Sequence, residues 1–350
     1  LPDTLDGFTD PAWKGRIGWA PTNGSFQAMV TGMRIVWGED RTREWLEGIV
    51  ANEATVYAKN TPTVAATGAG EVEVGFVNHY YLHRFLAEEG DGFAARNYFL
   101  PGGGPGSAVL VAGAAILKTA ENESQAKRFL DYLLSEEAQN YFAEETYEYP
   151  LIDGVSHSEL LPALDTLNTP DIDISDLGDL EATQNLLREA GALPGSAAAS
   201  SAPAATSTPE TGGELVIYSG RSESLVDPLI KMFEEATGID AKVNYGKTGE
   251  LAATLLEEGD RSPADVFFAQ DPGGLGSVID MVGPLDSDLI DRVPGWASSP
   301  DDLWVGISGR ARTVVYNTDE LSPEGLPDTL DGFTDPAWKG RIGWAPTNGS

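Results

Sequence analysis

The sequence predicts an α/β protein built from two lobes, and three observations support this fold class. Between residues 215 and 282, short apolar strands alternate with amphipathic helices, and a similar alternation returns between 16 and 145. This rhythm predicts a mostly parallel sheet with helices on both faces. A chain of 350 residues is also long enough for two lobes with separate cores. Ligands of such folds lie between the lobes, at loops beyond the ends of strands.

The C-terminal half shows the alternation most clearly. Apolar residues recur at helical spacing in 222–237, and Gly238 is the expected stop of that helix. The expected order is strand 215–218, helix 222–237, strand 241–246, helix 248–258, strand 264–270 and helix 272–282.

The N-terminal half begins with a strand that ends in a small polar turn. The expected elements are strand 16–20, helices 26–37 and 40–51, strand 72–78, helix 80–89, the buried strand 108–117, helices 124–134 and 135–145, and a last helix at 180–193.

An exact internal repeat suggests that the chain is written in rotated order. Residues 1–25 recur unchanged at 326–350, and 194–213 is an Ala/Ser/Pro/Thr/Gly-rich stretch typical of a flexible linker. We therefore expect a circularly permuted chain, whose natural order starts near Glu214, passes through Ser350 and ends near Leu193. Deliberate permutation, a fragment of tandem copies and an assembly error remain open explanations.

This order predicts how the chain divides between the lobes. The expected segments are 1–101 in the second lobe, 102–152 in the first lobe, 153–193 as C-terminal helices of the second lobe, 194–213 as the linker, 214–312 as the N-terminal part of the first lobe, and 313–350 as a crossover into the second lobe. The sheet has one place for the strand that the repeat encodes. Because the first copy is joined directly to helix 26–37, we expect it to take that place, and Gly340–Ser350 to fray or to pair with another molecule.

Composition excludes several classes of function. The chain has 55 acidic and 22 basic residues, a net charge of −33, which argues against a nucleic-acid partner. The acidic surface is either simply solvated or attracts cations. Cysteine is absent, so disulfides, thiolate metal sites and thiol nucleophiles are excluded, and any metal must be held by oxygen or imidazole. No apolar run is long enough to cross a bilayer, and no targeting segment is found from which localisation could be inferred.

The clearest candidate site is the segment Asn78-His79-Tyr80-Tyr81, directly after an apolar strand. One interpretation is structural: one ring packs in the core and the other is exposed. The other is that Tyr80 and Tyr81 are phenolate ligands, hard anionic oxygens suited to a hard cation such as Fe(III), which lowers the tyrosine pKa. His83 follows His79 by four residues without the acidic partner of zinc proteases, so we expect both histidines on the surface or behind the ligands.

Two further clusters could bind an anion. Thr22-Asn23-Gly24-Ser25 lies between a strand and a helix, where exposed backbone N–H groups form an anion pocket, although Asn23 or Ser25 could simply cap the helix. Arg310 and Arg312 lie two residues apart on an extended segment, so they face the same way, toward an anion or toward acidic side chains in salt bridges.

Enzyme motifs are missing from the sequence. It contains no P-loop and no GxSxG, and the glycine run 102–106 lacks the spacing of a dinucleotide fingerprint. We therefore expect a binding protein rather than an enzyme.

Read in rotated order, the chain resembles the ferric-ion-binding branch of the periplasmic solute-binding proteins of ABC importers. The segments that carry the resemblance are VIYSGR at 216–221, SPADVFF at 262–268, SGRARTVVYNTD at 308–319, WKGRIGWAPTNGSF at 13–26, AKN at 58–60, VNHYYLHRF at 77–85 and EYPL at 148–151. The resemblance implies the two-lobed periplasmic-binding-protein fold with an ion in the cleft. It further implies a periplasmic or extracellular location, a permease partner and a possible lipid anchor.

The resemblance also implies residue roles. Tyr80 and Tyr81 match the iron ligands. The positions that match a synergistic anion site, for carbonate, phosphate or citrate, are Asn23, Gly24, Ser25, Asn60, Asn78 and Arg310.

Three positions depart from the family pattern. Ser222 stands where members carry a histidine ligand, Phe26 stands where some carry a tyrosine, and Gln270, with Asp271 beside it, stands where they carry a glutamate ligand. Gln270 and Asp271 are therefore weaker metal candidates. The alternative functions are binding of a small organic anion without metal, or service as an engineered permuted scaffold.

Overall fold

The computed structural model describes residues 2–3, 11, 14, 18–19, 22–57, 59–100, 103–193, 214–320, 322 and 331–332. The predicted linker 194–213 and the segment Gly340–Ser350 lie outside these residues. Within the described part of the chain, no helix is both long enough and apolar enough to span a membrane.

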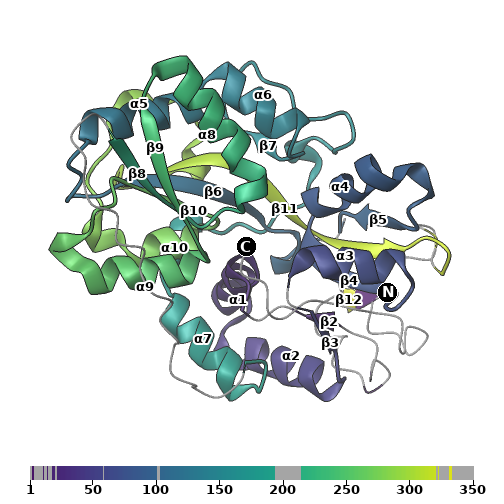
Figure 1. The fold of residues 1–350 in the computed structure, drawn as a ribbon. Coiled ribbons are helices and arrows are strands. Elements are labelled where there is room, and N and C mark those ends of the chain that lie inside the picture. The colour runs from purple at the N-terminus through teal and green to yellow at the C-terminus, as the bar shows by residue number, and fades with distance from the viewer. Residues whose placement is uncertain are drawn as a thin grey trace.

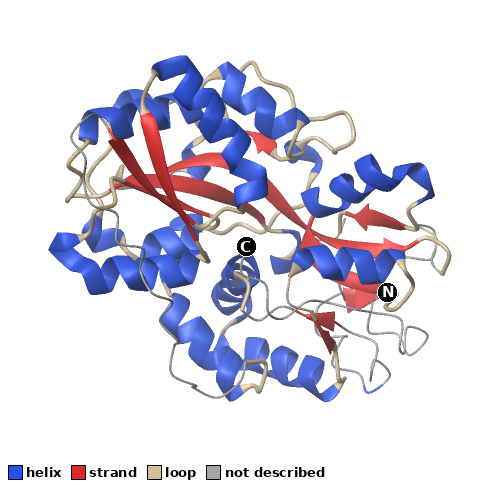
Figure 2. Cartoon of the chain, viewed as in Figure 1, coloured by secondary structure: helices blue, strands red, loops and turns tan. Residues whose placement is uncertain are grey.

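A single large sheet connects the two lobes (Figures 1 and 2). Its main strand order is β4 (Val74–Asn78), β11 (Val305–Asn317), β6 (Val109–Ile116), β10 (Val266–Ala269), β8 (Glu214–Ser219) and β9 (Asp240–Tyr245). Two further strands, β5 (Ala95–Tyr98) and β7 (Tyr149–Pro150), also pair with β11. The α/β fold class is confirmed.

Strand β11 belongs to both lobes. Its residues from Val305 to Ala311 pair with β6, and those from Arg312 to Tyr316 pair with β4. All 13 residues of the strand are buried. Arg310 and Arg312 therefore lie on either side of the point where β11 changes its pairing from β6 to β4.

The expectation of a mostly parallel sheet is wrong. Only β9, β8 and β10 run parallel within the large sheet, whereas β6 and β11 pair antiparallel with their neighbours. The βαβ pattern holds from 214 to 269, where helices connect successive strands. The long strand β11 and the returning strand β6 come from distant parts of the chain, and no crossover helix forces them to be parallel.

Helices flank the sheet in each lobe, as Figure 2 shows. Around the strands β6 and β8–β10 lie α5 (Glu123–Leu133), α6 (Glu136–Glu144), α8 (Glu223–Thr237), α9 (Thr248–Glu258), α10 (Pro272–Ser277) and α11 (Ser287–Ile290). Around the other half of β11 lie α1 (Gly24–Trp37), α2 (Glu39–Ala51), α3 (Asn60–Gly68), α4 (Tyr80–Glu89) and α7 (Leu180–Glu189). Short 3-10 turns connect several of them.

Local chemistry explains where two of these helices end. Gly238 ends α8 in the left-handed conformation, at φ 69°, which glycine adopts without a steric penalty. The predicted helix 272–282 is instead α10, which stops at Ser277, followed by a 3-10 turn at Ile279–Met281. Its glycines favour a short helix, and Gly276 lies against the backbone of Gly178, where an added Cβ would approach within 2.5 Å.

Two large hydrophobic clusters form the core, and the larger one extends across the junction between the lobes to Val77, Tyr80 and Tyr81. The larger one surrounds β6, β8 and β10 and includes Phe129, Phe233 and Phe267. The second lies among α1, α2, α7 and the far half of β11, and includes Trp45 and Leu187.

The first copy of the repeat supplies the strand beside helix α1. Within this copy, β2 (Gly18–Trp19) pairs in parallel with β3 (Thr55–Val56), and the Trp19 side chain is buried in the second cluster. Of the second copy, the structure describes only the short strand β12 (Asp331–Gly332). This strand pairs with β1 (Pro2–Asp3) of the first copy. The two copies thus contact each other through this short antiparallel pair.

Candidate functional site

The adjacent tyrosines lie at the junction between strand β4 and helix α4. Both side chains are buried, with 1% and 3% of Tyr80 and Tyr81 exposed. Their rings stack on each other, with centroids 4.2 Å apart and planes 28° from parallel. The interpretation in which one ring is exposed is therefore wrong. Because the two rings stack on each other, both can be buried in the same part of the core.

The electrostatic surroundings of Tyr80 include two positive charges. Burial raises the pKa of Tyr80 well above 10, and the neighbouring Tyr81 and the charge of Glu148 raise it further, whereas Arg221 and Arg310 pull it down. Without a metal the phenol keeps its proton. A bound cation adds to the effect of the two arginines and favours the phenolate.

His79 and His83 are buried, so of the two expected positions, on the surface or behind the ligands, the surface is excluded. His79 is 0% exposed, and its Nδ1 accepts a hydrogen bond from the backbone N–H of Ala311 at 3.0 Å. Its Nε2 then donates to the carbonyl oxygen of Tyr147 at 2.7 Å. Burial lowers the pKa of each histidine to about 4. His79 therefore ties the start of α4 to β11, behind the tyrosines.

Arg310 reaches across the junction between the lobes. Its Nη1 donates to the Ser25 hydroxyl at 3.1 Å, and its Nη2 donates to the carbonyl oxygens of Val111, at 3.0 Å, and of Gln270. Arg312 donates to Asn78 Oδ1 at 3.3 Å. Burial, followed by the repulsion of Arg310, lowers the pKa of Arg312 to about 10. Among the described residues neither arginine forms a salt bridge, so the salt-bridge alternative finds no support.

A buried ion pair beside the tyrosines was not predicted from the sequence. Arg221, two residues after the end of β8, forms a two-pronged ion pair with Glu148, with one N–O distance of 3.0 Å. The Ser308 hydroxyl donates to the same carboxylate at 2.6 Å. Burial opposes the charge of Glu148, yet Arg221 outweighs it and lowers the pKa of Glu148. The one hint of this ion pair in the sequence is an arginine close to the end of a buried strand. A charged side chain at such a position needs a partner, because it is not exposed to water.

The turn Thr22–Ser25, called the anion turn below, begins helix α1. Asn23 is the N-cap, because its Oδ1 accepts from the backbone N–H of Phe26 at 2.8 Å. The capping interpretation is thus correct for the oxygen, while the Nδ2 of Asn23 has no partner among the described residues. Ser25 accepts hydrogen bonds from Arg310 and from Gln270 Nε2, the latter at 3.2 Å.

Gln270 and Asp271 contact the anion turn from the opposite lobe. Asp271 is 1% exposed, and its carboxylate lies so close to Gly24 that an added Cβ there would be 2.2 Å from Oδ2. Only glycine at position 24 allows this approach. The hydrogen bond of Gln270 to Ser25 lies in the same place. Both residues thus lie against the anion turn.

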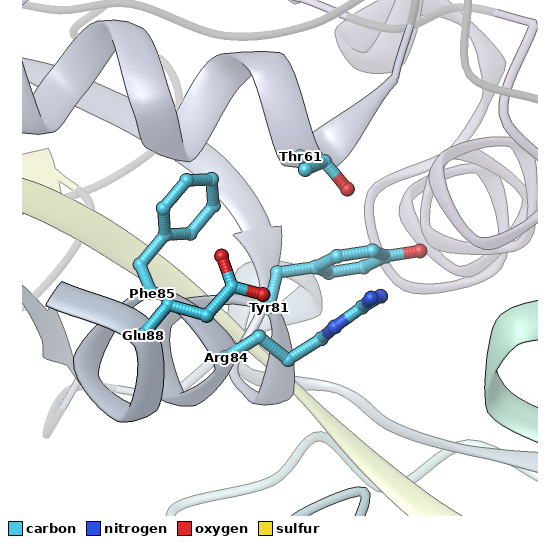
Figure 3. A pocket seen from close by; sticks show the side chains of 5 residues that line it. All are labelled: Thr61, Tyr81, Arg84, Phe85 and Glu88. Atoms are coloured by element: carbon cyan, nitrogen blue, oxygen red, sulfur yellow. The ribbon is translucent and has the colours of Figure 1, made fainter.

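Asn60 and Asn78 complete the set of predicted residues. Each is at most 1% exposed, and neither Nδ2 has a partner among the described residues. Asn78 is joined to Arg312. Asn60 precedes Thr61, which lines a small cavity of about 50 Å³ together with Tyr81 and Arg84 (Figure 3). In that view the Arg84 side chain extends beside the Tyr81 ring, toward its hydroxyl end.

The predicted residues around Arg310 therefore form a connected arrangement. Arg310 contacts the anion turn directly and interacts electrostatically with Tyr80 and Asp271. Buried donors of the predicted residues that lack a partner in the described part of the chain are Asn23 Nδ2, Asn60 Nδ2, Asn78 Nδ2, Arg310 Nε and Arg312 Nε. Because each unsatisfied buried group costs about 1–3 kcal/mol, such a set indicates a site for a ligand rich in acceptors. No group of three His, Cys, Asp or Glu side chains suited to a metal occurs in the described residues.

Comparisons with known proteins agree in both halves of the chain. Residues 1–176 match a family model described as bacterial extracellular solute-binding protein, and residues 219–343 match a second model of the same description.

The names of individual relatives refer to iron. The chain is 34% identical over 192 residues to the major ferric iron-binding protein of Neisseria meningitidis serogroup B, covering 55% of this chain and 58% of that protein. It is 35% identical over 198 residues to iron uptake protein A2 of Synechocystis, covering 54% and 57%. The crystal structure of iron-bound HitA from Pseudomonas aeruginosa matches with 32% identity and a TM-score of 0.52, covering 55% and 62%. The matched parts span less than two thirds of each relative.

Proposed function

Because this chain belongs to the bacterial extracellular solute-binding proteins, we propose that it captures Fe(III) between its lobes and delivers it to the permease of an ABC importer. It would work in the periplasm or at the outer face of the cell membrane. Relatives named for ferric iron binding and iron uptake support the cargo, and solute binding rather than catalysis is what its family does.

The observation that carries the proposal is the pair of buried, stacked tyrosines beside two arginines. Two phenolates supply hard anionic oxygens to a trivalent ion. The arginines lessen the cost of losing the phenolic protons. The protein would thus hold the ion with Tyr80 and Tyr81, and no thiolate or imidazole is needed.

Two protein ligands leave most positions of an iron ion open. We propose that a synergistic anion, namely carbonate, phosphate or citrate, fills some of them from the pocket of Asn23, Gly24, Ser25, Asn60, Asn78 and Arg310. The unpartnered N–H groups of the three asparagines and of Arg310 support this, because an oxyanion would accept their hydrogen bonds. Gln270 and Asp271 remain the weaker metal candidates of the proposal, and both contact the anion turn.

A visible spectrum tests the proposal directly. Tyrosinate-to-iron charge transfer gives a red-orange colour, so titration of the metal-free protein with ferric citrate should develop a visible band that saturates near one iron per chain. A protein that stays colourless while citrate binds would refute iron capture.

That second outcome would favour the alternative function, binding of a small organic anion without metal. One feature speaks for it: Arg221, Arg310 and Arg312 are all buried near the tyrosines, and neutral phenols can donate hydrogen bonds to a carboxylate. Calorimetry with iron-free citrate would measure this binding.

A further inference from the structure

His79, which directly precedes the tyrosine pair, has a hydrogen bond at each of its polar atoms. It is the N-cap of α4 and is fully buried. Its backbone N–H donates to the carbonyl oxygen of Ala311 at 3.1 Å, and its ring Nδ1 accepts from the N–H of the same residue at 3.0 Å. Its ring Nε2 donates to the carbonyl oxygen of Tyr147 at 2.7 Å, and its own carbonyl oxygen accepts from Asn97 Nδ2 at 2.7 Å.

These partners come from three segments that are far apart in the sequence. Ala311 lies in β11, Asn97 lies in β5, and Tyr147 lies between α6 and β7. Tyr147 is itself held firmly, because the next residue, Glu148, forms the buried ion pair with Arg221. The backbone of Tyr147 is left-handed, at φ 56°, a conformation that a residue other than glycine keeps only where the surrounding structure enforces it. The start of α4 is thus fastened to three fixed parts of the fold.

His83, one helical turn further on, provides a contrast within the same helix. Residues four apart lie on one face of a helix, so both histidines face Tyr147. The His83 ring stacks on the Tyr147 ring, with centroids 5.0 Å apart and planes 27° from parallel. It is as good as buried, at 6% exposed, yet neither of its ring nitrogens has a hydrogen-bond partner among the described residues. Of these two buried histidines, His79 is the one that is anchored and the one that adjoins the tyrosines.

The position of the tyrosines explains why an anchor matters. Tyr80 and Tyr81 are the first two residues of α4. The first turn of a helix is weakly constrained by the helix itself, because its N–H groups have no partners within the helix. Ligands of a metal need to be held within about 0.5 Å of the productive geometry by the groups behind them. The hydrogen bonds of His79 supply that constraint at the residue before the ligands.

We propose that His79 is a positioning residue for iron, which fixes the phenolic oxygens of Tyr80 and Tyr81 through its ring hydrogen bonds to Ala311 and Tyr147 and does not contact the ion. The inference rests on the proposed function. It adds a residue that determines iron affinity from behind the ligands.

A graded series of substitutions tests the inference. His79→Leu keeps an apolar bulk and loses both ring hydrogen bonds, whereas His79→Gln can still offer an amide N–H to the Tyr147 carbonyl. After loading with ferric citrate, His79→Leu should bind iron at least about tenfold more weakly than the wild type in competition with a chelator, and its visible band should shift. His79→Gln should lie between the two. His83→Leu makes the same change in a buried histidine of the same helix and should match the wild type.

Urea unfolding of the metal-free variants separates positioning from mere packing. A role confined to packing lowers stability and leaves the band and the iron affinity of the folded protein unchanged, which would overturn the inference. If His79→Leu does not fold, His79→Gln decides, and wild-type affinity and band in that variant would overturn it as well. Losses in His83→Leu as large as those in His79→Leu would show that the hydrogen bonds are not the cause.

The wild-type spectrum distinguishes a failure of this inference from a failure of the proposed function. A wild type that binds iron with a normal band, together with His79 variants that do the same, refutes only the positioning role. A wild type that never develops a band refutes iron capture itself, and with it the ligands that His79 is proposed to position.

Discussion

Two sets of buried polar groups meet near the stacked tyrosines, and they differ in whether their hydrogen bonds are complete. In the first set, Arg221, Glu148 and Ser308 satisfy one another. In the second, Asn23, Asn60 and Asp271 each keep a buried atom without a partner among the described residues. Both sets are equally inaccessible to solvent, so burial alone does not separate them.

The difference indicates two roles. A complete buried network is stable without a ligand and fixes the positions of its members. An incomplete one costs free energy in the empty protein, and a ligand that supplies the missing partners recovers that cost. We therefore expect the first set to control stability and the second to control binding.

The largest expected effect on stability comes from the complete set. Glu148→Gln leaves Arg221 buried without its counter-charge, which should lower the free energy of unfolding by about 3–5 kcal/mol. Urea unfolding of the iron-free protein measures this, with the exposed Glu257→Gln as control. A loss below about 1 kcal/mol would show that the pair is not structural.

Acid should reduce the same contribution. The pKa of Glu148 is lower in the folded protein than its ordinary value of 4.5. The stabilisation is therefore fully present above pH 4.5 and is lost as the pH falls through the lowered folded value. The difference in unfolding free energy between wild type and Glu148→Gln should shrink in that range. A difference that stays constant down to pH 3 would contradict the assignment.

The incomplete set should show the opposite pattern. Asn60→Ala removes a buried amide whose Nδ2 bonds to nothing described, so stability should change by less than about 1 kcal/mol. Iron affinity should fall about tenfold, because one charge-assisted hydrogen bond to the anion is worth about 1.4 kcal/mol or more. Competition with a chelator measures the affinity. A large loss of stability with unchanged affinity would reverse the comparison.

The repeat provides a matched control for the smallest expected effect. Asn23→Asp keeps the oxygen that caps α1 and removes the free Nδ2, so it should preserve stability and weaken iron binding several-fold. Asn348 is the same residue in the second copy. Asn348→Asp should leave both quantities unchanged. If only the second-copy variant weakens binding, the second copy rather than the first supplies the anion turn.

The elements that could be predicted from the sequence are those determined by the pattern of neighbouring residues. Hydrophobic spacing and Gly238 located α8 closely, and the doubled tyrosine was placed correctly at the junction of β4 and α4. Helix α3 and strand β5 were not predicted. The small polar residues of Asn60–Gly68 carry little periodic signal, and β5 is defined by its pairing with β11 rather than by its own residues.

Effects of distant packing were harder to predict. The stacking that buries both tyrosines and the partnership of Arg221 with Glu148, 73 positions apart, depend on how β11 joins the lobes. The lobe boundary expected between residues 312 and 313 stays a prediction, and β11 changes its pairing from β6 to β4 between Ala311 and Arg312. The rotated order of the natural chain stays a prediction.

The most direct measurement of the central claim is the visible band of the ferric protein in single-tyrosine variants. Tyr80→Phe and Tyr81→Phe each remove one anionic ligand, so each should abolish or strongly shift the band and weaken iron binding by orders of magnitude. His83→Ala removes a buried ring from the same helix and should leave the colour unchanged. If the histidine variant bleaches the protein while both tyrosine variants stay red-orange, iron is not held by the stacked tyrosines.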